Sequence, residues 1–129
     1  MNFKINAFNK KYKAEVLGFC FDIGHANIVR LDFHDFITTL GSRLKVLHLH
    51  DNDGLFDLHQ LPFTFTKTRD NNSSTNWPAF TKALKDTGFD GVLSFETAPV
   101  LNAFPAEMKP AVLKLIYETG VYLSGEIEK

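Results

Sequence analysis

The chain has 129 residues, a formal net charge of −1 and an apolar fraction of 44 %, values that are ordinary for one soluble domain. Its 14 basic and 15 acidic residues disfavour nucleic acid as the main partner, because domains that bind phosphate backbones carry a basic excess. The single cysteine, Cys20, excludes an internal disulfide and fits a reducing compartment. No apolar stretch approaches the roughly 20 residues that span a bilayer, and no signal peptide is evident. We therefore expect a cytoplasmic protein without membrane contact.

The first half of the chain alternates short apolar runs with amphipathic segments. Residues 1–15 are polar, show no clear period and are expected to be irregular. Residues 17–22, LGFCFD, form a short apolar run that is typical of a buried parallel strand, and a loop follows it. A helix is predicted over 32–40, with Asp32 as its N-cap, and a second strand over 43–50, RLKVLHLH.

The second half repeats the same alternation after a long polar segment. That segment runs from 51 to 76, and its part from Lys67 to Asn76 is expected to be mobile. A helix is predicted over 77–86, a third strand over 91–96, GVLSFE, and a last helix over 105–123. The resulting order of strands and helices predicts an α/β fold with parallel strands and right-handed crossovers.

The three predicted strands share one chemical feature. Successive side chains of a strand point to opposite faces, so each strand has one face of large apolar residues and one of small or polar residues. The polar faces end in Asp22, His48 and Glu96, at the strand ends where parallel α/β folds place their ligands. These donors suit a divalent cation such as Mn²⁺, Zn²⁺ or Mg²⁺. The alternative is that each polar residue caps a helix or hydrates a strand end.

Four motifs in this order resemble the xylose isomerase-like barrels: FDIGHAN, VLHLHDND, DLH and GFDGVLSFE. That group includes ketose 3-epimerases, sugar-phosphate isomerases and apurinic-site endonucleases. The resemblance covers residues 16–100 and implies that residues 1–129 form a single domain. This domain would be part of a (β/α)8 TIM barrel, about three of its C-terminal βα units with parallel strands.

The resemblance also implies a metal site. The family carries its metal on Glu, Asp, His and Glu at successive strand ends, and Asp22, His48 and Glu96 match the last three. Glu96 would also move a proton at the carbon beside a sugar carbonyl, while the metal stabilises an enediolate.

Four further residues are expected near the substrate. His25 matches the family's substrate-contacting histidine, with a backbone-bonded histidine as the alternative. His50 either orients a ligand or is a packed histidine. Asp57 and His59 match an Asp-x-His pair that binds an additional metal in the endonucleases and lies near substrate in many sugar enzymes; a hydrated loop is the alternative. His34 is expected on the surface.

The chain departs from the family in two respects. A family barrel has eight βα units and typically about 250 residues, and the first metal-binding Glu would belong to an N-terminal half that is not seen here. The segment 60–76 is also longer than the family's turn and lacks glycine. We therefore expect a metal-dependent sugar or sugar-phosphate isomerase or epimerase that is incomplete alone. It would pair with a second copy or with the missing half, because open strand edges favour association. The alternatives are a non-catalytic half-barrel module and, less favoured, a DNA-repair hydrolase.

Overall fold

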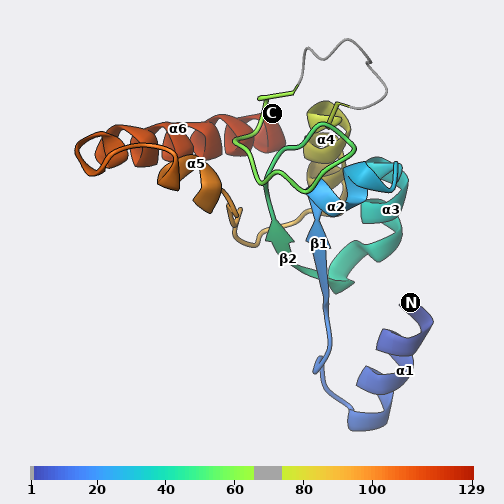
Figure 1. The fold of residues 1–129 in the computed structure, drawn as a ribbon. Helices are drawn as coiled ribbons and strands as arrows, with labels where there is room; N and C mark the ends of the chain where they lie inside the picture. The colour runs from blue at the N-terminus through green and yellow to red at the C-terminus, as the bar shows by residue number, and fades with distance from the viewer. Residues whose placement is uncertain (1, 66–73) are drawn as a thin grey trace.

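The computed structural model describes residues 2–65 and 74–129, and most of the segment expected to be mobile lies outside the described residues (Figure 1). In the described residues two strands lie in the first half of the chain, and only helices follow the second strand. The elements in order are α1 Asn2–Tyr12, β1 Phe19–Asp22, α2 Ile23–Ile28, α3 Phe33–Leu40, the 3-10 turn η1 Gly41–Arg43, β2 Leu44–His48, α4 Trp77–Thr87, α5 Ala98–Asn102, the 3-10 turn η2 Ala106–Met108 and α6 Lys109–Glu128.

The two strands pair in parallel, as predicted. Asp22 is opposite His48, and Phe21 is opposite Leu47. Phe21 and Leu47 are buried, whereas Cys20 is exposed, which is the predicted alternation of faces. The register therefore brings the last residues of both strands, Asp22 and His48, side by side.

The prediction of a regular third strand over residues 91–96 is wrong. The segment makes one parallel bridge, Leu49 to Phe95, with hydrogen bonds from the Leu49 N–H to the Ser94 carbonyl (2.8 Å) and from the Glu96 N–H to the Leu49 carbonyl (3.0 Å). It runs beside the extension of β2 rather than along its whole length, so a full ladder does not form. These two hydrogen bonds still fix Glu96 next to the end of β2.

The two central helices form as their local signals predict. The Asp32 carboxylate accepts a hydrogen bond from the Asp35 N–H (2.9 Å) at the start of α3, and the Asn76 side chain accepts one from the Ala79 N–H (3.1 Å) at the start of α4. Gly88 ends α4 with φ +63°, a left-handed conformation that glycine adopts at little cost.

The core lies between the strands and the helices α3 and α4. Phe21 of β1 stacks on Phe80 of α4 (ring centroids 6.2 Å apart) and meets Phe33 of α3 edge-on (5.8 Å). Trp77 packs edge-on against Phe80 (5.8 Å), and Leu123 of α6 joins the same cluster. The large apolar face of the strands is therefore covered by helices on one side.

Four helical regions differ from the sequence expectation. One is α5, Ala98–Asn102, where no helix was predicted. Residues 2–12, expected to be irregular, form α1, and residues 23–28, expected to be a loop, form α2. The helix α2 forms because Asp22 caps it, accepting a hydrogen bond from the His25 N–H (2.9 Å). The last helix begins later than predicted, because the 3-10 turn η2 takes up Ala106–Met108, and it also ends later, at Glu128.

The opposite face of the strands is open. Cys20 of β1 is exposed, and Val46 of β2 and Val92 of the neighbouring segment 91–96 are 43 % and 75 % exposed. Figure 1 shows α6 extending well beyond the two strands and α1 standing apart near the N-terminus. None of the helices in the described parts of the chain combines the length and apolarity needed to cross a bilayer.

Candidate metal centre

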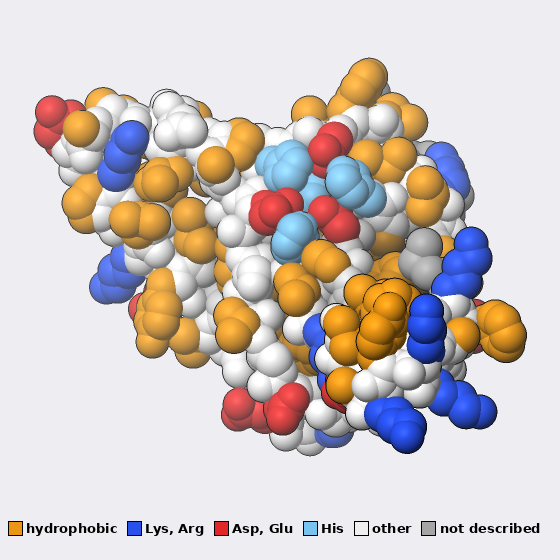
Figure 2. Space-filling view, turned by 90° about the horizontal axis from the view of Figure 1, so that it is seen from below, with side chains coloured by type: hydrophobic (Ala, Val, Ile, Leu, Met, Phe, Trp, Pro, Cys, Tyr) orange, Lys and Arg blue, Asp and Glu red, His pale blue; other side chains and the backbone are white. Residues whose placement is uncertain are grey.

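The seven residues that the sequence singled out lie together at the C-terminal ends of the strands. Asp22 ends β1, His48 ends β2, and Glu96 is held beside them by its bond to Leu49. Figure 2 shows the histidine and carboxylate side chains gathered in one patch, with the Lys and Arg side chains lying away from it. Glu15, the one acid of the first 15 residues, pairs instead with Lys45 (3.0 Å) near the start of β2.

Six of these side chains form a closed ring in which imidazoles and carboxylates alternate, which we call the imidazole–carboxylate ring. Each carboxylate lies between two histidines, so no two carboxylates are neighbours in it. The contacts in order are His50 Nε2 to Asp22 Oδ1 (3.1 Å), Asp22 Oδ2 to His48 Nδ1 (3.8 Å), His48 Nδ1 to Glu96 Oε1 (3.1 Å), Glu96 Oε2 to His59 Nδ1 (3.9 Å), His59 Nε2 to Asp57 Oδ2 (3.2 Å) and Asp57 Oδ1 to His50 Nε2 (3.8 Å).

The seventh residue, His25, lies outside this ring and contacts two of its carboxylates. Its Nδ1 lies 3.4 Å from Asp22 Oδ2, and its Nε2 lies 3.2 Å from Asp57 Oδ2. Its side chain is 62 % exposed, so it forms the outer wall of the patch. The helix α2 places it there, because His25 lies in the first turn that Asp22 caps.

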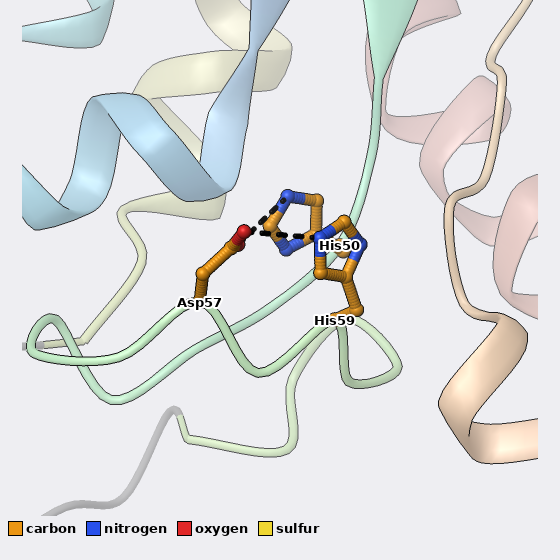
Figure 3. A group of neighbouring side chains, drawn as sticks. All are labelled: His50, Asp57 and His59. Carbon is orange, nitrogen blue, oxygen red and sulfur yellow. Dashed lines mark hydrogen bonds and ion pairs between the residues drawn. The ribbon is translucent and has the colours of Figure 1, made fainter.

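His59 is held in an uncommon backbone conformation. Its φ is +50°, a left-handed geometry that costs a non-glycine residue of order 1–3 kcal/mol and concentrates at functional sites. Its Nδ1 lies 2.9 Å from the Glu96 carbonyl oxygen, and its ring stacks on His50 with centroids 3.9 Å apart (Figure 3). Figure 3 also shows the Asp57 carboxylate facing both rings.

Two buried residues that the sequence did not single out fix the loop that carries Asp57 and His59. Asp51 exchanges backbone hydrogen bonds with Gln60 (2.7 and 2.9 Å), which closes the loop at its base. Asn52 donates to the Gly24 carbonyl (2.9 Å) and accepts from the Gly54 N–H (2.9 Å). Both are fully buried. In the sequence these two residues are the Asp-Asn pair that directly follows His50 in the motif VLHLHDND.

The comparisons with known proteins agree with these motifs. The profile of the family described as Xylose isomerase-like TIM barrel matches residues 5–114. The chain belongs to this family. Two relatives are the Uncharacterized protein y4fM of Sinorhizobium fredii, 33 % identical over 87 residues, and the Uncharacterized protein MJ1311 of Methanocaldococcus jannaschii, 29 % identical over 112 residues. The matches cover 67 % and 84 % of this chain but 25 % and 36 % of those proteins. No solved structure matches at a significant level.

This member of the xylose isomerase-like barrels therefore spans about a quarter to a third of the length of the curated relatives it matches. Family members often bind metals, and the described residues contain two groups of donors whose atoms lie within 4.8 Å of one another. These are His50, Asp57 and His59, and Asp22, His50 and Glu96. The predicted trio differs from the second group only in having His48 in place of His50.

The donor set fits a divalent cation. Two atoms that each bind one ion at about 2.1 Å lie roughly 3.0–3.4 Å apart at octahedral or tetrahedral angles and at most about 4.2 Å apart. The contacts in the imidazole–carboxylate ring fall between 3.1 and 3.9 Å. The many imidazoles favour Zn²⁺ or Mn²⁺ over Mg²⁺, which prefers oxygen ligands.

The surroundings of Asp22 and Asp57 favour the ionised form of these two carboxylates. Burial alone would raise the pKa of Asp22, but the hydrogen bond from His50 and the His25 N–H lower that pKa to about 2. Burial would also raise the pKa of Asp57, but the hydrogen bond with His25 and the charge of His59 outweigh it. The pKa of Asp57 is therefore lowered. The pKa of His59 is raised, because its bond to the Glu96 carbonyl and the nearby Asp57 outweigh burial. Ionised carboxylates are the form that binds metal.

Proposed function

We propose that this chain carries a divalent-metal centre of a sugar or sugar-phosphate isomerase or epimerase. The observation that supports it most directly is the convergence of Asp22 and His48, at the ends of the two strands, with Glu96, which lies beside the end of β2, in contacts of 3.1 and 3.8 Å. The family and its motifs supply the reaction class. The site chemistry supplies the preference for Mn²⁺ or Zn²⁺.

The side chains would divide the work as follows. Asp22, His48 and Glu96 hold the metal, which polarises the sugar carbonyl and its neighbouring hydroxyl when bound. Glu96, whose side chain is 38 % exposed, takes or returns the proton at the carbon beside the carbonyl. His25, whose side chain is the most exposed of the seven, orients a substrate hydroxyl from the outer side of the site.

We further propose that the chain acts as the C-terminal βα units of a (β/α)8 barrel. The open face bearing Cys20, Val46 and Val92 would then line the barrel interior. The pairing partner would be a second copy or the N-terminal units of a barrel, and the second acid–base group would come from that partner. Among the described residues, no further carboxylate lies in the imidazole–carboxylate ring besides Asp22, Asp57 and Glu96.

Thermal melts of metal-stripped protein, with and without Mn²⁺ or Zn²⁺, test the metal centre. A cation at a hundred times its dissociation constant stabilises the native state by about 2.7 kcal/mol. We expect a rise in the wild type that is lost in Glu96→Gln and kept in His34→Gln, a histidine bonded to Asp86 outside the ring. A confirmed site would then be screened with ketoses for epimerisation. An unchanged melting temperature with every cation would refute the metal centre and favour a non-catalytic half-barrel module.

A second candidate is a metal-dependent hydrolase of the apurinic-site endonuclease type. It is favoured by one observation: His25 Nε2 and His59 Nε2 each lie 3.2 Å from Asp57 Oδ2, an arrangement suited to an additional metal. The balance of 14 basic to 15 acidic residues disfavours it. Metal analysis separates the two. More than one bound ion per chain, reduced by Asp57→Asn, together with salt-sensitive cleavage of abasic DNA, would support the hydrolase.

A further inference from the structure

His50 is the least accessible side chain of the site. Its ring is fully buried, stacked on His59 and enclosed by Asp22 and Asp57. Among the described residues its Nδ1 has no hydrogen-bond partner. A buried polar atom without a partner costs about 1–3 kcal/mol, so an apolar ring would fill this space at lower cost. A role in packing alone therefore does not explain a histidine here.

The chain also makes room for this ring at Gly24. A Cβ added at Gly24 would lie 1.9 Å from the His50 Cε1 atom and within 2.5 Å of both ring nitrogens. Gly24 lies in α2 and has no left-handed backbone that would itself require glycine. The absence of a side chain at Gly24 thus lets His50 hold its Nε2 3.1 Å from Asp22 Oδ1.

The His50 Nε2 lies 3.1 Å from Asp22 Oδ1, a spacing that two ligands of one ion also have. One ring nitrogen of His50 and one oxygen each of Asp22 and Glu96 lie within 4.8 Å of one another. Asp22, His48 and Glu96 give three donors. His50 would be the fourth, and four donors complete the coordination that Zn²⁺ prefers.

We propose that His50 binds the same metal ion as Asp22 and Glu96, and that it fills a coordination position at which the described residues place no second glutamate. The proposal rests on the metal centre proposed above and adds to it that the described residues suffice to hold the ion. The chain would then bind metal before any partner completes the barrel, leaving the partner to supply substrate contacts and the second acid–base group.

Cobalt binding to the purified, metal-stripped chain tests this. Co²⁺ would be titrated up to one equivalent into wild type, His50→Gln and the control His34→Gln, and visible absorption would report affinity and coordination. We expect His50→Gln to bind at least about tenfold more weakly, a loss typical of weakened metal sites, with an altered spectrum, while His34→Gln matches wild type. Wild-type binding with an unchanged affinity and spectrum in His50→Gln would overturn this inference alone. No binding by wild type would overturn both it and the metal centre.

A second pair of variants decides the question if His50→Gln does not fold. Gly24→Ala removes no donor but pushes the His50 ring aside, and Gly125→Ala adds a methyl group on α6 where no atom lies within 4 Å. We expect Gly24→Ala to weaken Co²⁺ binding and Gly125→Ala to leave it unchanged. A folded Gly24→Ala that binds Co²⁺ as tightly as wild type would also overturn the inference.

Discussion

Replacing Asp22 by asparagine should destabilise the protein even when no metal is present. If the site were only a cluster of carboxylates without metal, the substitution would stabilise the protein, because removing one of several like charges relieves repulsion. In the structure, however, Asp22 lies between His50 and His48 and accepts the His25 N–H. Its hydrogen bonds with the His50 ring and the His25 N–H outweigh its burial and lower its pKa, so its negative charge is stabilising.

The magnitude follows from the pKa of Asp22. It is lowered from 3.8 to about 2, and each unit is worth about 1.4 kcal/mol. The side chain of Asp22 is 16 % exposed, so solvent screens its interactions only a little. The ionised carboxylate therefore contributes about 2 kcal/mol to the free energy of unfolding. Because the pKa is lowered in the folded state, this stabilisation is fully present above pH 4 and is lost as the pH falls through about 2.

Urea unfolding of chelator-treated protein measures the effect. At pH 7 we expect Asp22→Asn to be less stable by about 2 kcal/mol, or roughly 8 °C in melting temperature for a chain of this size. The difference should shrink steadily between pH 4 and pH 2, as the wild type loses its charge. Equal stabilities at pH 7, or a difference that does not change with pH, would show that the hydrogen bonds of Asp22 do not stabilise the fold.

Three further substitutions probe the scaffold that holds the site. Phe80→Ala empties a fully buried position against Phe21 and Trp77 and should cost about 3–5 kcal/mol in urea unfolding; a loss below 1 kcal/mol would contradict the packing. Asn76→Ala removes the cap of α4 and should cost about 1 kcal/mol, with Asn76→Asp restoring it. Gly88→Ala forces a side chain to φ +63° and should cost about 1 kcal/mol, whereas Gly125→Ala should not destabilise, as thermal melts would show.

Local signals in the sequence were sufficient for the central helices and the two strands. A cap, an apolar stripe and a terminal glycine all lie within one short segment, so α3 and α4 begin and end within about one residue of their predicted limits. Alternation within β1 and β2 correctly separated the buried Phe21 and Leu47 from the exposed Cys20. The same alternation identified Asp22 and His48 as neighbours at the strand ends.

Other elements depended on contacts that the sequence does not display. The segment 91–96 has a strand-like composition but finds a partner only at Leu49, so a single bridge replaces the third strand. The helix α2 depends on the Asp22 cap, and its sequence, IGHANI, contains a glycine and an asparagine that favour loops. The helix α1 carries no strong apolar period that would have predicted it.

The sequence by itself determined which side chains are available for chemistry and which strand ends carry them. It did not determine how they are arranged. Asp57 and His59 reach the site because Asp51 closes their loop on Gln60, and His50 is buried because Gly24 leaves space for its ring. Capping and alternation act between residues a few positions apart, whereas the alternation of imidazole and carboxylate requires three distant segments to meet. Only tertiary packing sets those distances, and with them the pKa of Asp22 and the donor spacing on which the proposed metal site depends.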